Sequence, residues 1–182
     1  MPQGTLLLAI ARATLARHLG ANGASEPATH SAQWLQKLGA TFVTLRIAGE
    51  LRGCIGSLHA KVPLADDLRS NAIAAATKDP RFEPLLADEL ERVEIEVSLL
   101  SPTEPLDATG EEEVLAALRP GIDGLVLCWR QQRSTLLPQV WEALPSPSKF
   151  LAALKNKAGL AETFWSSEVS IERYTVESWA EE

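Results

Sequence analysis

The chain has 182 residues, of which 46% are hydrophobic and 23% are charged, and these are the proportions of an ordinary globular protein. This composition excludes collagen, a long coiled coil and a wholly disordered chain, and the length predicts one domain spanning residues 1–182. Seventeen basic and 24 acidic residues give a net charge of −7. Because this charge repels a phosphate backbone, nucleic acid is disfavoured as a partner.

Cysteine usage indicates a reducing compartment. Cys54 and Cys128 are too few for a disulfide scaffold and do not form a C-x-x-C pair, so the cytoplasm is the expected location. The apolar run at residues 6–11 is too short to span a membrane. Arg12 and Arg17, in a first segment without acids, would also fit a mitochondrial presequence; the favoured interpretation is the first helix of the domain.

The histidines are scattered without ligand spacing, and no structural metal is predicted. They are His18, His30 and His59. The chain also lacks a G-x-G-x-x-G, a Walker loop, a G-x-S-x-G and an H-E-x-x-H. The signatures of common cofactor sites and hydrolases are therefore missing, and the sequence implies no cofactor.

The first half of the chain alternates helical and strand patterns. Alternating apolar residues on both sides of Ala48-Gly49-Glu50 predict a β-hairpin. Apolar residues at helical spacing predict a packing helix before Gly20 and a second helix after Pro63. In chain order we expect a helix at 5–19, a loop at 21–29, a short helical piece at 33–38, strands at 42–47 and 51–56, and a helix at 64–78.

The second half repeats this mixture. Thr109 with Glu112 matches a capping box that opens a helix. Further elements are expected as strands at 93–100, 124–129, 133–137 and 169–176, with helices at 109–118 and from Ser146-Pro147 to Gly159. Because hairpins predominate over regular βαβ units, the predicted class is α+β with a mainly antiparallel sheet flanked by helices.

Charge is distributed unevenly along the chain. Residues 41–82 contain six bases and four acids, whereas residues 83–113 contain eleven acids and one base, Arg92. An anionic ligand would therefore be attracted to the first of these segments.

The strongest candidate for a catalytic or binding site is the segment Leu51-Arg52-Gly53-Cys54-Ile55-Gly56. Period two in a strand places Arg52, Cys54 and Gly56 on one face and Gly53 on the other. A guanidinium beside a thiol favours the thiolate, which makes Cys54 a candidate nucleophile and Arg52 a candidate anion ligand. Gly53 and Gly56 would allow a ligand to approach the backbone closely.

A structural interpretation of the same segment stays open. Cys54 would then be a small buried residue, the glycines would accommodate a bulge or a crossing element, and Arg52 would pair with a carboxylate. His59 lies five residues after Cys54. In a continued strand that odd separation would place the two on opposite faces, so a Cys–His dyad is poorly supported.

For four other residues the sequence predicts a ligand-binding or a purely structural role. Arg81, in Asp79-Pro80-Arg81-Phe82, could hold a carboxylate or phosphate ligand, or could simply pair with Asp79. Lys155 and Lys157 are expected to lie in solvent at a helix end. Cys128 is expected in the core.

The hexapeptide at residues 51–56 resembles the signature of the AMMECR domain family. The likeness continues in the segments at residues 41–45, 79–85, 97–102, 121–124, 137–141 and 154–160. The resemblance implies an α+β domain with a larger and a smaller, intimately packed lobe and a cleft at the hexapeptide. It implies no reaction.

Bacterial and archaeal members of that family look like the A component of the AmmeMemoRadiSam system. The resemblance therefore implies a Memo-like protein and a radical S-adenosylmethionine protein as partners. Two interpretations result, and whether the protein is an enzyme stays open between them. One is an accessory protein that docks partners through acidic surfaces, and the other is a cysteine-dependent enzyme or binding protein for a small anion. A homodimer is a further option for assembly.

Overall fold

A computed structural model describes residues 2–21, 25, 27–28 and 32–181. The chain divides into two compact units, Met1–Leu100 with Glu177–Glu182 and Ser101–Val176. Most of the expected loop at 21–29, and His30, lie outside the described residues. Whether the two units behave as one domain stays a prediction. The α+β class is confirmed, since each unit combines helices with an antiparallel sheet.

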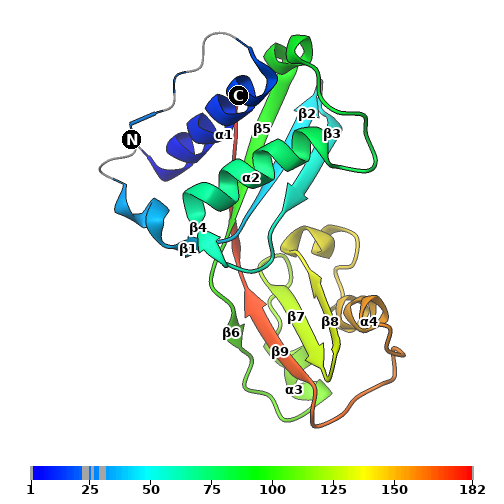
Figure 1. Ribbon diagram of the computed structural model, residues 1–182. Coiled ribbons are helices and arrows are strands. Elements are labelled where there is room, and N and C mark those ends of the chain that lie inside the picture. The colour runs from blue at the N-terminus through cyan, green and yellow to red at the C-terminus, as the bar shows by residue number, and fades with distance from the viewer. Residues whose placement is uncertain (1, 22–24, 26, 29–31, 182) are drawn as a thin grey trace. The chain divides into compact units, whose positions relative to one another are not determined.

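The first unit contains a four-stranded sheet in the order β10-β5-β2-β3. Strand β2 pairs antiparallel with both β3 and β5, and helices α1 and α2 are drawn over the sheet in Figure 1. Val43 and Leu45 of β2 have no exposed surface, so the alternation seen in the sequence marks the core face. The bounds are β2 Thr41–Ile47, β3 Glu50–Gly56, β5 Val93–Leu100, β10 Val176–Ala180, α1 Gln3–Leu19 and α2 Leu64–Thr77.

Shorter elements connect the main ones. The strands β1 (Leu38–Gly39) and β4 (Val62–Pro63) form a separate two-stranded ladder. The 3-10 helices η1 (Gln33–Gln36) and η2 (Ala87–Arg92) precede β1 and β5. The segment between α2 and η2 carries the Asp-Pro-Arg-Phe turn.

The second unit contains the sheet β6-β9-β7-β8. Its core includes Trp141 stacked on Phe150, with ring centroids 3.9 Å apart. The elements are β6 Glu104–Pro105, α3 Glu111–Ala117, β7 Gly124–Trp129, β8 Gln132–Leu136, η3 Pro138–Glu142, α4 Pro147–Lys157 and β9 Ser170–Tyr174.

The helices and hairpins predicted from periodicity are confirmed to within a few residues. One local prediction is wrong. Helix α3 begins after Gly110 rather than Thr109, and both the backbone N–H and the hydroxyl of Thr109 donate to Glu113 instead of forming a box with Glu112. The strand expected at 169–176 is confirmed as β9, and the chain then adds β10, which was not predicted and which pairs in the sheet of the first unit.

The prediction that Lys155 is solvated is also wrong. Lys155 is only 1% exposed, and its Nζ donates to Glu111 Oε1 at 2.6 Å and to the carbonyl of Glu162 at 2.8 Å. Lys157 donates to the carbonyl of Thr135. Cys128, at the end of β7, is half-buried rather than in the core. Among the described residues no helix has the length and apolarity needed to cross a lipid bilayer.

Candidate functional site at the edge of β3

The predicted site lies on β3, which is an edge strand of its sheet. Its pairing with β2 shifts register, so that Leu51 lies opposite Arg46 and Gly53 opposite Leu45, and Arg52 is left as an extra residue. Such a bulge interrupts the alternation of side chains. The strict period-two arrangement expected through residues 51–53 is therefore wrong, because Leu51 and Gly53 pair with residues on opposite faces of β2.

Arg52 forms a fork with a carboxylate 37 residues away in sequence. Its Nε and one terminal nitrogen donate to the two oxygens of Glu89, each at 3.0 Å, and the other terminal nitrogen donates to the carbonyl of Glu83 at 2.9 Å. Both side chains of the pair are 18% exposed. The hydrogen bonds from Arg52, followed by one from the N–H of Leu86, lower the pKa of Glu89. This geometry matches the structural interpretation of Arg52.

Asp79 joins the Asp-Pro-Arg-Phe turn to the edge of β3. Its Oδ2 accepts the backbone N–H of Cys54 at 2.8 Å. Arg81 donates to Oδ1 from Nε at 2.9 Å and to Oδ2 from a terminal nitrogen at 2.6 Å. The Asp79 side chain is 2% exposed and that of Arg81 is 54% exposed. Hydrogen bonds from Arg81 are the main reason that the pKa of Asp79 lies far below its usual range.

Cys54 is a half-buried residue with a free thiol. Its Sγ lies 3.2 Å from the hydroxyl of Thr44, the residue that pairs with it across the hairpin. Arg81 also approaches the carbonyl of Cys54, at 3.5 Å. The guanidinium close to the Cys54 backbone is therefore that of Arg81, whereas the guanidinium of Arg52 is held by Glu89.

The glycines of the hexapeptide are required by packing. A Cβ on Gly53 would lie 2.1 Å from the carbonyl oxygen of Ala75 in α2, and a Cβ on Gly56 would lie 2.2 Å from the ring of Phe42. Real Cβ atoms do not approach their neighbours so closely. Gly53 thus lets α2 lie directly against β3, which is the crossing element considered in the structural interpretation.

A buried polar cluster next to this site was missed by sequence reasoning. Asp67 Oδ2 accepts from the N–H and hydroxyl of Thr41 at 2.7 and 2.8 Å and from Asn71 Nδ2 at 2.9 Å. Asn71 also donates to Ser57, just beyond β3. The signal was present, because Asp67 and Asn71 are four residues apart on one helix face. His59 lies after β3 has ended, so strand periodicity does not determine its position.

Comparisons with known proteins show the family of the chain and support its fold. The AMMECR1 family model matches residues 8–179. A protein of Methanothermobacter thermautotrophicus is 37% identical over 187 residues, covering 99% of this chain and 95% of the relative. A protein of Thermotoga maritima is 42% identical over 140 residues, covering 76% of this chain and 75% of the relative.

A solved structure is also similar. The crystal structure of an uncharacterised protein from Pyrococcus horikoshii has a TM-score of 0.82 and 31% sequence identity, and it covers 98% of this chain and 91% of that one. The α+β fold described above is accordingly shared with a solved structure, and the chain belongs to the AMMECR1 family.

Proposed function

We propose that this AMMECR1-family protein acts as a non-catalytic accessory protein that binds other proteins. The family resemblance supports an AmmeMemoRadiSam-like system, with a Memo-like protein and a radical S-adenosylmethionine protein as the partners. A reducing cytoplasm is the compartment that fits this proposal. A homodimer is not required by it.

The observation that carries the proposal is that both arginines of the candidate site are bound to carboxylates of the same unit. Arg52 is held by Glu89 and by the carbonyl of Glu83, and Arg81 is held by Asp79. A guanidinium fork that already binds a carboxylate has lost the geometry that would recognise a ligand anion. The hexapeptide and the turn at 79–82 are thus best explained as a clamp that holds the edge of β3 to the segment following α2.

The surroundings of Cys54 support the same conclusion. A nucleophilic cysteine needs a neighbouring base. The carboxylate bonded to the Cys54 backbone is Asp79, and it is a very weak base because its pKa is lowered so far by Arg81. Thr44, whose hydroxyl contacts the thiol, is not a base at neutral pH.

The segment that follows the clamp offers a docking surface. Leu86 is 62% exposed, and Glu83, Asp88 and Glu91 around it in sequence are exposed as well. An apolar side chain surrounded by acids is complementary to a partner surface that is apolar at its centre and basic at its rim. We therefore expect the partner to present such a surface to residues 83–91.

The test uses the full chain with the Memo-like and radical S-adenosylmethionine proteins of the same organism. We expect at least one of them to form a complex that survives gel filtration at about 10 µM protein, a concentration that detects micromolar affinity. Leu86→Asp should weaken this complex at least about tenfold, as expected for an apolar anchor. The matched control is Ile122→Asp in the second unit, where Ile122 is 50% exposed. Absence of any complex, or equal effects of the two variants, would refute the proposal.

A second candidate function is a cysteine-dependent enzyme, or a binding protein for a small anion, that uses Cys54, Arg52 and Arg81. The observation in its favour is that Cys54 is half-buried rather than sealed and that Arg81 keeps 54% of its side chain exposed. Such a protein would need the Asp79–Arg81 pair to open so that Arg81 meets the anion. Loss of a measured ligand affinity in both Arg52→Ala and Arg81→Ala would favour this function over the first.

A further inference from the structure

The edge strands of the two four-stranded sheets are protected to different degrees. Strands β3 and β10 form the edges in the first unit, and β6 and β8 form those in the second. An edge strand presents backbone N–H and C=O groups that can pair with another chain unless something covers them. On β3 this protection exists, because the N–H of Cys54 donates to Asp79.

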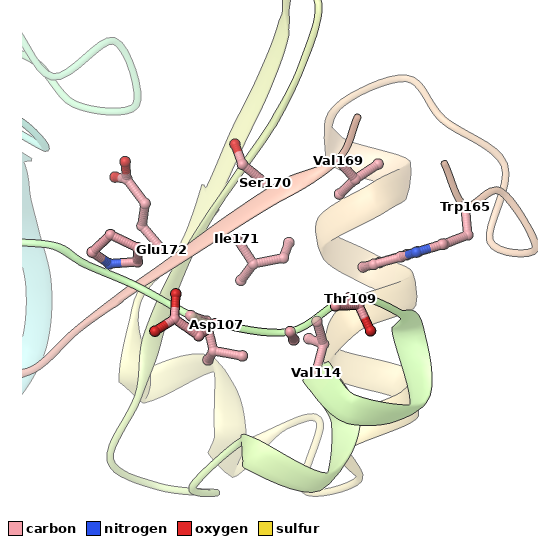
Figure 2. Close-up of a pocket in the computed structure, with 11 residues that line it drawn as sticks. Asp107, Thr109, Val114, Trp165, Val169, Ser170, Ile171 and Glu172 are labelled. Atoms are coloured by element: carbon pink, nitrogen blue, oxygen red, sulfur yellow. The ribbon is translucent and has the colours of Figure 1, made fainter. Parts of the chain in front are cut away.

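The edges of the second unit are also covered. Lys157 of α4 donates to the carbonyl of Thr135 in β8. Strand β6 is only two residues long, and beyond it the N–H of Leu106 donates to the carbonyl of Ile171 in β9 at 2.9 Å. Figure 2 shows the segment after β6 passing close to Ile171 and lining a pocket with it.

Strand β10 lacks such protection. The N–H of Glu181 donates to the carbonyl of Ile95 in β5 at 3.0 Å, and backbone groups alternate along a strand. Val176, Ser178 and Ala180 therefore direct their N–H and C=O groups away from β5. None of these outward groups forms a hydrogen bond with a described residue, and Ser178 and Ala180 are exposed.

The open edge is nevertheless firmly held in its own sheet. Arg12 of α1 donates to both carboxylate oxygens of Glu181, and Trp179 packs against the core of the first unit. The hydroxyl of Ser178 lies 2.8 Å from that of Ser98 in β5. Strand β10 is therefore a fixed template for a further strand, and its openness is not a consequence of fraying.

The strand can pair with its own copy in an antiparallel register. A two-fold axis at Ser178 pairs this residue with Ser178 of the second copy, and pairs Val176 with Ala180 of the second copy. In this register all three outward-facing residues exchange backbone hydrogen bonds with outward-facing residues of the other strand.

The charges on β10 favour this register over its neighbours. With the axis at Ser178, the exposed Glu177 lies opposite Trp179 of the second copy. An axis at Glu177 would place this residue opposite its own copy, and an axis at Trp179 would place it opposite Glu181. Like charges directly opposite each other destabilise a strand pair, so the chain avoids them only with the axis at Ser178.

We propose that two copies of this chain associate through β10, antiparallel and with the two-fold axis at Ser178, so that one continuous sheet runs through both first units. This assembly is independent of the docking surface at residues 83–91, which it does not use.

The association is measured by sedimentation velocity of the full chain between about 1 and 300 µM. We expect a monomer–dimer equilibrium with a dissociation constant of about 10–100 µM, as for a small interface. Because each copy carries a net charge of −7, added salt should strengthen the dimer. A chain that stays monomeric at about 300 µM, as it would if the edge took a strand of another protein, would overturn the proposal.

Charge variants test the register. Ser178→Lys and Ser178→Glu each place like charges opposite each other, and each should weaken the dimer at least about tenfold. An equimolar mixture of the two should restore dimerisation, although both lack the hydrogen bond to Ser98. The matched control is Glu50→Lys at the exposed start of the protected edge β3, which should leave the dimer unchanged. No restoration in the mixture, or an equal effect of the control, would refute the register.

A proline variant tests the hydrogen bonds themselves. Ala180→Pro removes an outward N–H that the monomer does not use, a position where proline is tolerated in an edge strand. It should abolish the dimer while circular dichroism shows an unchanged fold. Leu86→Asp should leave the dimer intact, which separates this interface from the docking surface. An unaffected dimer in Ala180→Pro would contradict pairing through β10.

Discussion

The carboxylate of Asp79 accepts the backbone N–H of Cys54 at a distance of 2.8 Å, across 25 residues of sequence. Cys54 lies on an edge strand, whose outward N–H groups would otherwise be free to pair with another chain. Arg81 fixes the same carboxylate from the other side. The hexapeptide at 51–56 and the turn at 79–82 therefore form one structural feature of the first unit.

Replacing Asp79 should expose how much this feature stabilises the fold. Asp79→Ala removes the acceptor of the Cys54 N–H and leaves Arg81 without its partner, so the free energy of unfolding should fall by about 2–4 kcal/mol. Urea unfolding followed by circular dichroism measures the change. The control is Asp88→Ala at an exposed position, which should change it by less than about 0.5 kcal/mol. Similar values for the two variants would show that Asp79 is dispensable.

Stability should also depend on pH through the two clamped carboxylates. The pKa values of Asp79 and Glu89 are lowered in the folded protein, by hydrogen bonds from Arg81 and Arg52 respectively. Their contribution is therefore complete above the unfolded values of about 3.9 and 4.3 and is lost as the pH falls through the folded values.

The urea midpoint should consequently decline below about pH 4. A double variant, Asp79→Ala with Glu89→Ala, starts from lower stability and should show a shallower decline over the same range. Parallel curves for the double variant and the natural sequence would contradict this assignment of the acid sensitivity.

Gly53 should tolerate no side chain. In Gly53→Ser the new Cβ would lie 2.1 Å from the carbonyl oxygen of Ala75, and α2 would have to move from β3, at a cost of at least about 3 kcal/mol of unfolding free energy. Gly110→Ser is the matched control, because a Cβ added at Gly110 would have no neighbour within 4 Å and serine is a good N-cap for α3. Thermal unfolding of both variants gives the comparison. Equal stability of the two variants would mean that α2 moves away from β3 without lowering the free energy of unfolding.

Lys155 offers a test of a buried ion pair in the second unit. Lys155→Ala leaves a cavity and removes the partner of Glu111, and should cost about 3 kcal/mol of unfolding free energy. Lys155→Met fills most of the cavity but leaves Glu111 equally unpaired, so it should cost about 1–2 kcal/mol less than the alanine variant. Urea titrations of the two variants distinguish them. A methionine variant as unstable as the alanine variant would show that the charge itself is required.

Alkylation of Cys54 distinguishes the two proposed functions. In a Cys128→Ala background, Cys54 is the one thiol that can be alkylated. If the protein is an accessory protein, Cys54 should react with iodoacetamide at pH 7 no faster in the folded chain than in the same chain unfolded in urea. The reason is that Arg52 is engaged by Glu89 instead of activating the thiol. Reaction at least about tenfold faster in the folded chain would favour the cysteine-dependent function.

The two interpretations of the hexapeptide could be formulated from sequence but not decided. Gly53 and Gly56 signalled either a ligand or a crossing element. At Gly53 the crossing element is α2, through the carbonyl of Ala75, and at Gly56 the space is filled by the ring of Phe42 on the paired strand. Period two predicted Leu51 and Gly53 on one face of the strand, and the bulge at Arg52 is where that prediction failed. A bulge depends on how two strands pair, so one strand's own sequence does not specify it.

The sequence by itself determined the α+β class, the main helices and hairpins and the family likeness, because periodicity, turn residues and short motifs are local properties of the chain. Local sequence also offered the pair of Arg81 with Asp79, but only the tertiary structure decided the partners of Arg52 and Lys155. Glu89 lies 37 residues from Arg52, and Glu111 lies 44 residues from Lys155. Charge pairs over such separations are selected by the packing of whole elements, and local patterns carry no information about which carboxylate a given arginine or lysine will meet.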